Sequence, residues 1–195
     1  MLFNSANSFA YRKNQMIKAL ARFILFKLYN WKIVGSFPED LKKYIVIGAP
    51  HTSNHDFIIG LCVKIILKVP VKFIGKKSLF KFPFGYFFRS VGGVPVNRKK
   101  NQKLVDSIIQ MYNQRDSFIL ALSPEGTRSK VADWKTGFYH IAKGANISIV
   151  AFTFDFGRKQ TQIFPPYYPT GDQKADFEYL KAIYSDVKGK VSENG

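Results

Sequence analysis

The feature that most constrains the fold is an alternation of short apolar runs with segments of helical spacing. The apolar runs predict strands at residues 44–49, 71–75, 93–96, 118–122, 147–154 and 160–164. Helical spacing predicts helices at residues 57–67, 101–114, 137–144 and 172–187, with short helical pieces at 76–92. Because each such helix can cross a sheet face to the next parallel strand, this alternation is typical of the α/β class. We therefore expect a single-domain αβα sandwich with a largely parallel, mixed sheet.

A further helix is expected ahead of this domain, at residues 12–31. All of its charged side chains are cations, and no acidic residue precedes Glu39. A basic amphipathic helix that is rich in aromatic residues can lie in the interface of a membrane. The same pattern also fits a helix that packs on a core with its cations in solvent. We favour the membrane, and we divide the chain into a membrane-associating amphipathic segment (1–34) and a main domain (35–195).

The chain is strongly basic, with 30 Lys and Arg against 13 Asp and Glu and a formal net charge of +17. This balance implies an anionic partner, such as nucleic acid, a phosphorylated ligand, an acidic carrier protein or an anionic membrane. No acidic residue lies between Asp56 and Asp106, where cations are interleaved with phenylalanines. Such a surface favours anionic lipid, although aromatics among cations also serve base stacking, and scattered solvated lysines are a further alternative.

The remaining composition narrows the class of protein. A 46% apolar content excludes global disorder. The single cysteine, Cys62, allows no internal disulfide, which fits a reducing compartment, and no Cys and His spacing suggests a zinc site. No uncharged apolar stretch reaches the roughly 18 residues of a membrane-spanning helix. The N-terminus has no signal-peptide pattern, because charges interrupt its apolar positions.

Residues 51–56 read His-Thr-Ser-Asn-His-Asp and connect the strand at 44–49 to the helix that follows. On such a tight connection the carboxylate of Asp56 can fold back onto the ring of His51. A carboxylate that holds one imidazole nitrogen leaves the other free to accept a proton, which makes a general base without a nucleophile of its own. The alternative is that Asp56 only caps the helix and His51 is a loop residue. The hexapeptide taken alone favours this alternative.

Two further loops combine glycine with arginine. One covers residues 92–98 and ends in Arg98, and the other covers residues 123–129 and follows the strand at 118–122. The carboxyl ends of strands in an α/β sheet are where ligands bind. Glycine lets the backbone approach a ligand closely, and arginine can hold a phosphate with two donors. Each loop taken alone is equally compatible with an ordinary turn.

Taken together and in this order, the three segments resemble the 1-acylglycerol-3-phosphate acyltransferase family of the glycerolipid acyltransferase superfamily, in its bacterial type. The His-x4-Asp block of the family matches His51 and Asp56, and the arginine that ends its second block matches Arg98. Its Pro-Glu-Gly-Thr-Arg-Ser block matches residues 124–129 without a gap. The resemblance covers roughly residues 35–160, and it implies a glycerolipid-acyltransferase-like fold.

The resemblance implies an O-acyltransferase in which His51, oriented by Asp56, removes the proton of an acceptor hydroxyl. The hydroxyl oxygen then attacks the thioester of acyl-CoA or acyl carrier protein, without an acyl-enzyme and without a cofactor besides this co-substrate. The acceptor is expected to be a lysophospholipid-type molecule such as 1-acylglycerol-3-phosphate. Its phosphate is expected to bind to Arg98, Glu125, Gly126, Thr127 and Arg128.

We therefore expect a peripheral (monotopic) enzyme of phospholipid biosynthesis on the cytoplasmic face of the cell membrane, which binds an anionic membrane surface but neither nucleic acid nor metal. The alternatives are the same chemistry on another acceptor, such as a lyso-aminolipid, and a non-catalytic basic module that binds membrane or nucleic acid. Ser123 departs from the family, which usually has Phe there. His55 and Cys62 are expected to have no catalytic role, and the tail after Lys188 is expected to fray.

Overall fold

The computed structural model describes residues 3–96 and 101–191, and five parallel strands form its central sheet. The strands are β2 (Lys43–Ala49), β3 (Val71–Lys76), β4 (Gly93–Val96), β5 (Phe118–Leu122) and β6 (Ser148–Thr153). They lie in the order β4-β3-β5-β2-β6, so that β2 and β5 are neighbours although they are far apart in the sequence. Isolated antiparallel bridges at β6, such as Ile149 to Tyr167, add the mixed character. The predicted fold class is confirmed.

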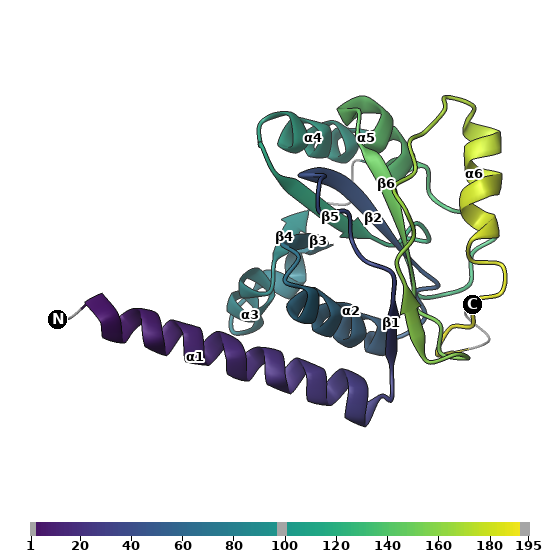
Figure 1. Cartoon of the computed structure of the whole chain (residues 1–195). Helices are drawn as coiled ribbons and strands as arrows, with labels where there is room; N and C mark the ends of the chain where they lie inside the picture. Colours follow the sequence, from purple (N-terminus) through teal and green to yellow (C-terminus); the bar gives the residue numbers. More distant parts are fainter. Residues whose placement is uncertain (1–2, 97–100, 192–195) are drawn as a thin grey trace.

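Helices cover both faces of this sheet (Figure 1). Their bounds are α1 (Phe3–Arg22), η1 (Phe23–Leu28), α2 (Asn54–Leu67), η2 (Lys77–Phe80), α3 (Phe84–Ser90), α4 (Asn101–Asn113), α5 (Gly137–Ala145) and α6 (Gln173–Ala182). Helices α4 and α5 lie on one face with α6 beside them, whereas α2 lies on the other face. A small parallel sheet joins β1 (Lys32–Val34) to β7 (Gln160–Gln162).

Strand β2 contributes to both halves of the core, because its side chains alternate between the two faces of the sheet. Tyr44 and Val46 pack in the cluster that contains α2, whereas Ile45 and Ile47 pack in the cluster that contains α4 and α5. All four side chains are buried. Parallel strands that are buried on both faces read as continuous apolar runs, which explains why this strand was visible in the sequence.

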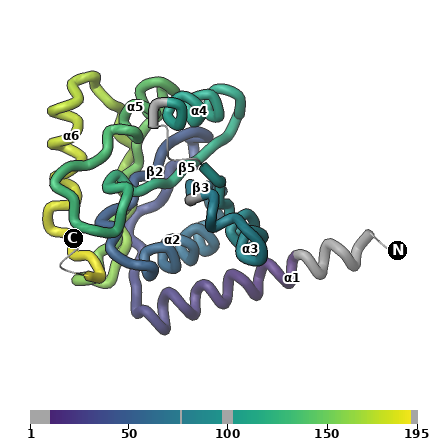
Figure 2. The backbone as a smooth tube through the Cα atoms, turned by 180° about the vertical axis from the view of Figure 1, so that it is seen from behind, coloured from purple at the N-terminus to yellow at the C-terminus, as the bar shows by residue number. Residues whose placement is uncertain are grey.

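The N-terminal helix begins well before the predicted start at residue 12, and only its end packs on the domain. After α1 the helix widens into the π-helical turns of η1. Ala21, Leu25 and Trp31 are buried in the same cluster as the apolar face of α2. Helix α1 runs beside α2, as Figure 1 and Figure 2 both show. The end of the helix therefore packs on the core, as the alternative interpretation predicted. Membrane association of the segment at 1–34 stays a prediction.

None of the helices in the described part of the chain combines the length and the apolar character that crossing a membrane requires.

The C-terminal helix α6 is shorter than the predicted 172–187, because the chain turns after Ala182 and brings the hydroxyl of Tyr184 to two strands. The hydroxyl of Tyr184 donates to the carbonyl of Ile47 at 2.7 Å and accepts from the backbone N–H of Phe152 at 3.2 Å. These two bonds attach the segment after α6 to the central sheet.

The tail beyond this point is held at the carboxyl edge of the sheet. The backbone N–H groups of Lys190 and Val191 donate to Oγ1 of Thr52 at 2.9 Å and 3.3 Å. The expectation that the chain frays after Lys188 is therefore wrong as far as Val191, the last described residue.

Candidate active site

The candidate site lies at the carboxyl edge of the central sheet, where β2 and β5 end side by side. Ile47 of β2 pairs with Leu122 of β5, so the loops that follow the two strands start from adjacent points. Helices α2 and α5 pack on opposite faces of the sheet, so the two connections diverge from adjacent strand ends, which is where ligands bind in α/β sheets. The fold thus brings the first and third sequence blocks together.

The loop after β2 is built around the carboxylate of Asp56, which is fully buried. Its Oδ2 accepts the backbone N–H groups of Thr52 and Ser53, each at 2.8 Å, and its Oδ1 accepts the Ser53 hydroxyl at 3.2 Å. Ser53 Oγ in turn accepts the backbone N–H of His55, which completes the capping box that starts α2. Asp56 therefore caps its helix, as the alternative interpretation predicted, and this leaves it fixed in position for His51.

The ring of His51 contacts the same carboxylate. Nδ1 of His51 lies 3.0 Å from Oδ2 of Asp56, and Nε2 lies 3.4 Å from Nε of Arg128. A guanidinium only donates hydrogen bonds, and the carboxylate oxygen already accepts two backbone N–H groups. These partners assign the ring proton to Nδ1 and the lone pair to Nε2. The side chain is 25% exposed, so a ligand can reach the ring, and in this tautomer Nε2 can accept a hydrogen bond or a proton from it.

Glu125 connects the loop after β5 to the loop after β2. Its Oε2 accepts the backbone N–H of His51 at 2.8 Å and the hydroxyl of Ser123 at 3.2 Å. Burial raises the pKa of Glu125, while the hydrogen bonds from His51 and Ser123 act in the opposite direction. This carboxylate therefore holds the backbone of His51 in the neighbouring loop, a partner that the sequence did not indicate. Its predicted contact with an acceptor phosphate stays a prediction.

Gly126 and Thr127 form the tight turn that follows Glu125. Gly126 has a φ of +68°, in the left-handed region that favours glycine, and its N–H donates to the carbonyl of Ser123 at 3.2 Å. Thr127 is exposed, and its Oγ1 accepts the backbone N–H of Ser129 at 3.4 Å. The turn places the next residue, an arginine, at the edge of the site.

Two arginines were predicted to hold a phosphate, and the structure describes one of them. The guanidinium of Arg128 lies beside the nitrogen of His51 that carries the lone pair. Arg98 lies outside the described residues, so its place in the site stays a prediction.

The sequence analysis missed a contact between the N-terminal helix and the catalytic loop, by which we mean residues 51–56. The hydroxyl of Tyr29 and Nδ1 of His55 are 2.6 Å apart, and burial raises the pKa of this tyrosine. His55, for which we expected packing or solvent exposure, therefore joins the end of η1 to the first turn of α2. No local pattern could have indicated a partner so distant in the chain.

The described residues offer neither a metal site nor an activated cysteine beside His51. Among residues 3–96 and 101–191, no three His, Cys, Asp or Glu side chains are arranged to hold a metal ion. Cys62 is buried, as expected, and burial raises the pKa of its thiol, which disfavours the nucleophilic thiolate.

Two comparisons with known proteins found matches. The family model described as Acyltransferase matches residues 14–155, a range that includes His51, Asp56, Glu125 and Arg128. A similar solved structure is the crystal structure of the 1-acyl-sn-glycerophosphate (LPA) acyltransferase, PlsC, from Thermotoga maritima. It shares 21% sequence identity with this chain at a TM-score of 0.60, and the match covers 93% of this chain and 80% of that chain. No curated protein sequence matches significantly. At this identity the structural match shows a common fold.

Proposed function

The chain belongs to the acyltransferase family, and we propose that it moves a fatty acyl group from acyl-CoA or acyl carrier protein to the hydroxyl of a lysophospholipid-type acceptor such as 1-acylglycerol-3-phosphate. The family match argues against the alternative of a non-catalytic binding module. The acceptor class is supported by the T. maritima protein, whose name describes an acyltransferase for 1-acyl-sn-glycerophosphate. On this proposal the protein is an enzyme of phospholipid biosynthesis.

In the proposed reaction, Nε2 of His51 takes the proton of the acceptor hydroxyl while the hydroxyl oxygen attacks the thioester carbonyl carbon. The tetrahedral intermediate then expels the sulfur, and the imidazolium returns its proton to the departing thiolate. The products are the new ester and the free thiol, so no side chain is acylated. Asp56, 3.0 Å from Nδ1, keeps the ring in the required tautomer and stabilises the imidazolium between the two steps.

The observation that carries the proposal is the position of Arg128 next to the nitrogen that accepts the proton. Nε of Arg128 lies 3.4 Å from Nε2 of His51, so an anion bound by the guanidinium would bring its neighbouring atoms close to the base. In 1-acylglycerol-3-phosphate the free hydroxyl is on the carbon next to the one that bears the phosphate. When the phosphate engages Arg128, the hydroxyl can replace the guanidinium at Nε2.

The test is a donor-by-acceptor screen with the purified full chain, in which mass spectrometry identifies the product. The donors are palmitoyl-CoA and palmitoyl acyl carrier protein, and the acceptors are 1-acylglycerol-3-phosphate, the same acceptor without its phosphate, and a lyso-aminolipid. We expect the phosphorylated acceptor to be preferred in kcat/KM by roughly 10- to 100-fold, the range of a charge-assisted hydrogen bond. If product forms only from the lyso-aminolipid, the proposed acceptor is wrong and the lyso-aminolipid takes its place. Thioester hydrolysis without any acylated lipid would contradict acyl transfer.

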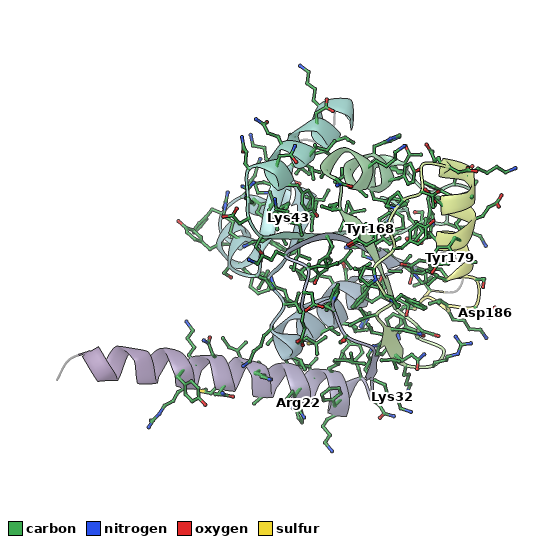
Figure 3. All side chains as sticks on the ribbon, turned by 45° about the horizontal axis from the view of Figure 1, so that its top comes forward. Arg22, Lys32, Lys43, Tyr168, Tyr179 and Asp186 are labelled. Carbon is green, nitrogen blue, oxygen red and sulfur yellow. The ribbon has the colours of Figure 1, made fainter. Side chains whose placement is uncertain are left out.

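We also propose that the enzyme binds to anionic lipid on the cytoplasmic face of the membrane. The thioester donors are made in the same compartment. Met16, Leu20 and Phe23 are exposed at the spacing of one helix face, at 72%, 59% and 59%. Cations such as Arg22, which Figure 3 labels, lie on the same helix. A helix with exposed apolar and cationic side chains supports binding in the interface of an anionic membrane.

A second exposed apolar group supports the same proposal. It lies at and just before α3, and its members are Leu79, Phe82, Phe84, Tyr86 and Phe87. Helix α3 packs on α2 through the rings of Phe88 and Phe57, and α1 also packs on α2. Exposed aromatic side chains in such numbers are unusual on a surface that faces only water.

A further inference from the structure

A cavity of about 900 Å³ lies beside the catalytic loop, apart from the groups that the proposed reaction uses. Four segments line it: the end of the N-terminal helix at Tyr29 and Trp31, the first turn of α2 at His55, the loop that ends at Lys159, and the tail at 187–190. Its volume is in the range of pockets that hold an organic ligand, about 300–1,000 Å³.

Hydrogen bonds fix these segments to one another, so the cavity is preformed. The bonds join Phe156 N–H to the Lys188 carbonyl at 2.8 Å, Lys32 N–H to the Lys159 carbonyl at 2.9 Å, Lys190 N–H to Thr52 Oγ1 at 2.9 Å, and the Tyr29 hydroxyl to the His55 ring at 2.6 Å. The tail passes so close to the catalytic loop that a Cβ on Gly189 would lie 2.5 Å from Cγ2 of Thr52. Thr52 directly follows His51 in the sequence, so the wall of the cavity contacts the residue next to the proposed base.

The charged side chains that line the cavity are all cations. Lys159, Lys188 and Lys190 contribute ammonium groups, and the lining contains no Asp or Glu. Trp31 and Phe156 contribute aromatic rings, which meet edge to face with their centroids 4.8 Å apart. Cations beside aromatic surface suit an anionic group that is joined to a larger organic molecule.

The proposed reaction needs more than one anion site. An acyl-CoA and an acyl carrier protein both carry a phosphate on the pantetheine arm, and the proposed acceptor carries another. Among the described residues of the two loops, Arg128 is the one guanidinium at His51, and it can hold one of these phosphates. Arg98 and Arg128 are together predicted to hold the phosphate of one substrate, so the phosphate of the other substrate needs a further group of cations near the same loop.

We propose that the cavity lined by Lys159, Lys188 and Lys190 is a second anion-binding site, which takes a phosphoryl group of one of the two substrates. The inference rests on the proposed function, since it draws the phosphate from those substrates. The phosphate belongs either to the pantetheine arm of the donor or to the acceptor.

The test is a binding measurement that needs no turnover. Trp31 lines the cavity, and the chain has two tryptophans, so Trp134→Phe leaves Trp31 as the fluorescent reporter. The protein is titrated with coenzyme A, 4′-phosphopantetheine and glycerol 3-phosphate, and calorimetry measures the same affinities independently of fluorescence. Lys188→Gln/Lys190→Gln is compared with a control, Lys42→Gln/Lys174→Gln, which removes the same charge from exposed lysines outside the lining.

We expect saturable binding of at least one probe, with a Kd that rises about fivefold or more in Lys188→Gln/Lys190→Gln and less than about twofold in the control. Weakened binding of coenzyme A and 4′-phosphopantetheine assigns the site to the donor, and weakened binding of glycerol 3-phosphate alone assigns it to the acceptor. Absence of saturable binding, or equal weakening in both double variants, overturns the inference. A protein that binds a probe in this way but transfers no acyl group contradicts the proposed function alone.

Discussion

Two carboxylates hold the same histidine from different directions. Asp56 fixes the ring of His51, and Glu125 fixes its backbone N–H. The first contact could be predicted, because the two residues are five apart on one strand-to-helix connection. The second could not, because its partners are 74 residues apart and no local pattern indicates which donor a loop carboxylate meets. Ser123, the departure from the family pattern, donates to the same carboxylate oxygen.

Asp56→Asn tests the ring contact. The amide can still accept backbone hydrogen bonds, but it no longer enforces the tautomer that leaves the lone pair on Nε2. We expect kcat/KM for acyl transfer to fall by roughly 10³- to 10⁴-fold, as in other His-Asp pairs. A loss of less than tenfold would show that Asp56 only caps its helix.

Glu125→Gln and Glu125→Ala separate a backbone-holding role from a charge-dependent one. Glutamine can still accept the His51 N–H, so we expect the Gln variant to retain most of its activity. The Ala variant should lose up to roughly 100-fold, because the base is misplaced.

Glu125→Gln also tests the effect of burial on folding stability. Burial raises the pKa of Glu125, so the ionised form is disfavoured in the folded state. The contribution of Glu125 to folding stability is therefore lost as pH rises through its folded-state pKa. At pH 7 the Gln variant should therefore unfold at an equal or higher urea concentration. Activity lost equally in Gln and Ala would assign the charge itself to the acceptor site.

At the scale of helices and strands, the central strands could be predicted from the sequence because both faces of the sheet are buried. The apolar runs at 44–49 and 118–122 correspond closely to β2 and β5, because parallel strands carry apolar residues on both faces. Strand β1 was missed: it is three residues long, and it pairs with β7 in a small sheet separate from the central one. The end of α6 was misplaced, because the bonds that turn the chain there join Tyr184 to distant strands.

Helix α6 is attached to the domain through Asp176, whose carboxylate is fully buried. It accepts the hydroxyls of Tyr139 at 2.9 Å, Tyr167 at 2.5 Å and Thr170 at 2.7 Å. Burial alone would raise the pKa of Asp176, but the hydrogen bonds outweigh it and lower the pKa to about 2. Because the folded-state pKa is depressed, this contribution to stability is present above the ordinary pKa of 3.8 and is lost as pH falls toward 2.

Asp176→Asn should therefore lower the free energy of unfolding by about 1–3 kcal/mol at pH 7, the cost of disrupting a buried hydrogen-bonded group. Urea denaturation between pH 5 and pH 2 measures the pH-dependent part of this contribution. The wild type should lose stability in this range more steeply than the variant, which lacks the carboxylate. Parallel pH profiles for the two proteins would show that Asp176 is not the titrating group.

The N-terminal helix can be tested without removing it. Deletion of residues 1–31 would also remove the buried side chains of Ala21, Leu25 and Trp31, so loss of membrane binding could reflect unfolding. Leu20→Glu/Phe23→Glu changes two exposed residues instead, and we expect the partition coefficient onto phosphatidylserine vesicles to fall by at least roughly tenfold. The matched control is Tyr168→Glu/Tyr179→Glu, which Figure 3 labels on the side of the domain that carries α6. Equal vesicle binding by both variants would mean that α1 does not contact the membrane.

At the scale of the whole molecule, the site depends on the convergence of segments that are distant in the sequence. The α/β class predicts that the loops after β2 and β5 meet at the carboxyl edge of the sheet, and the structure confirms it. The class does not predict that the end of η1 and the tail at 187–190 also reach this edge. Those contacts depend on single hydrogen bonds, such as the one between Tyr29 and His55, rather than on a repeated pattern.

The central claim is that His51 accepts the acceptor proton during acyl transfer, and His51→Ala tests it most directly. The measurement is kcat/KM for ester formation from palmitoyl-CoA and 1-acylglycerol-3-phosphate, with thermal unfolding of both proteins as the control for folding. Because His51 is partly exposed, we expect an unchanged melting temperature and a loss of about 100- to 10,000-fold in kcat/KM. A folded His51→Ala variant that keeps kcat/KM within fivefold of the wild type would contradict the account.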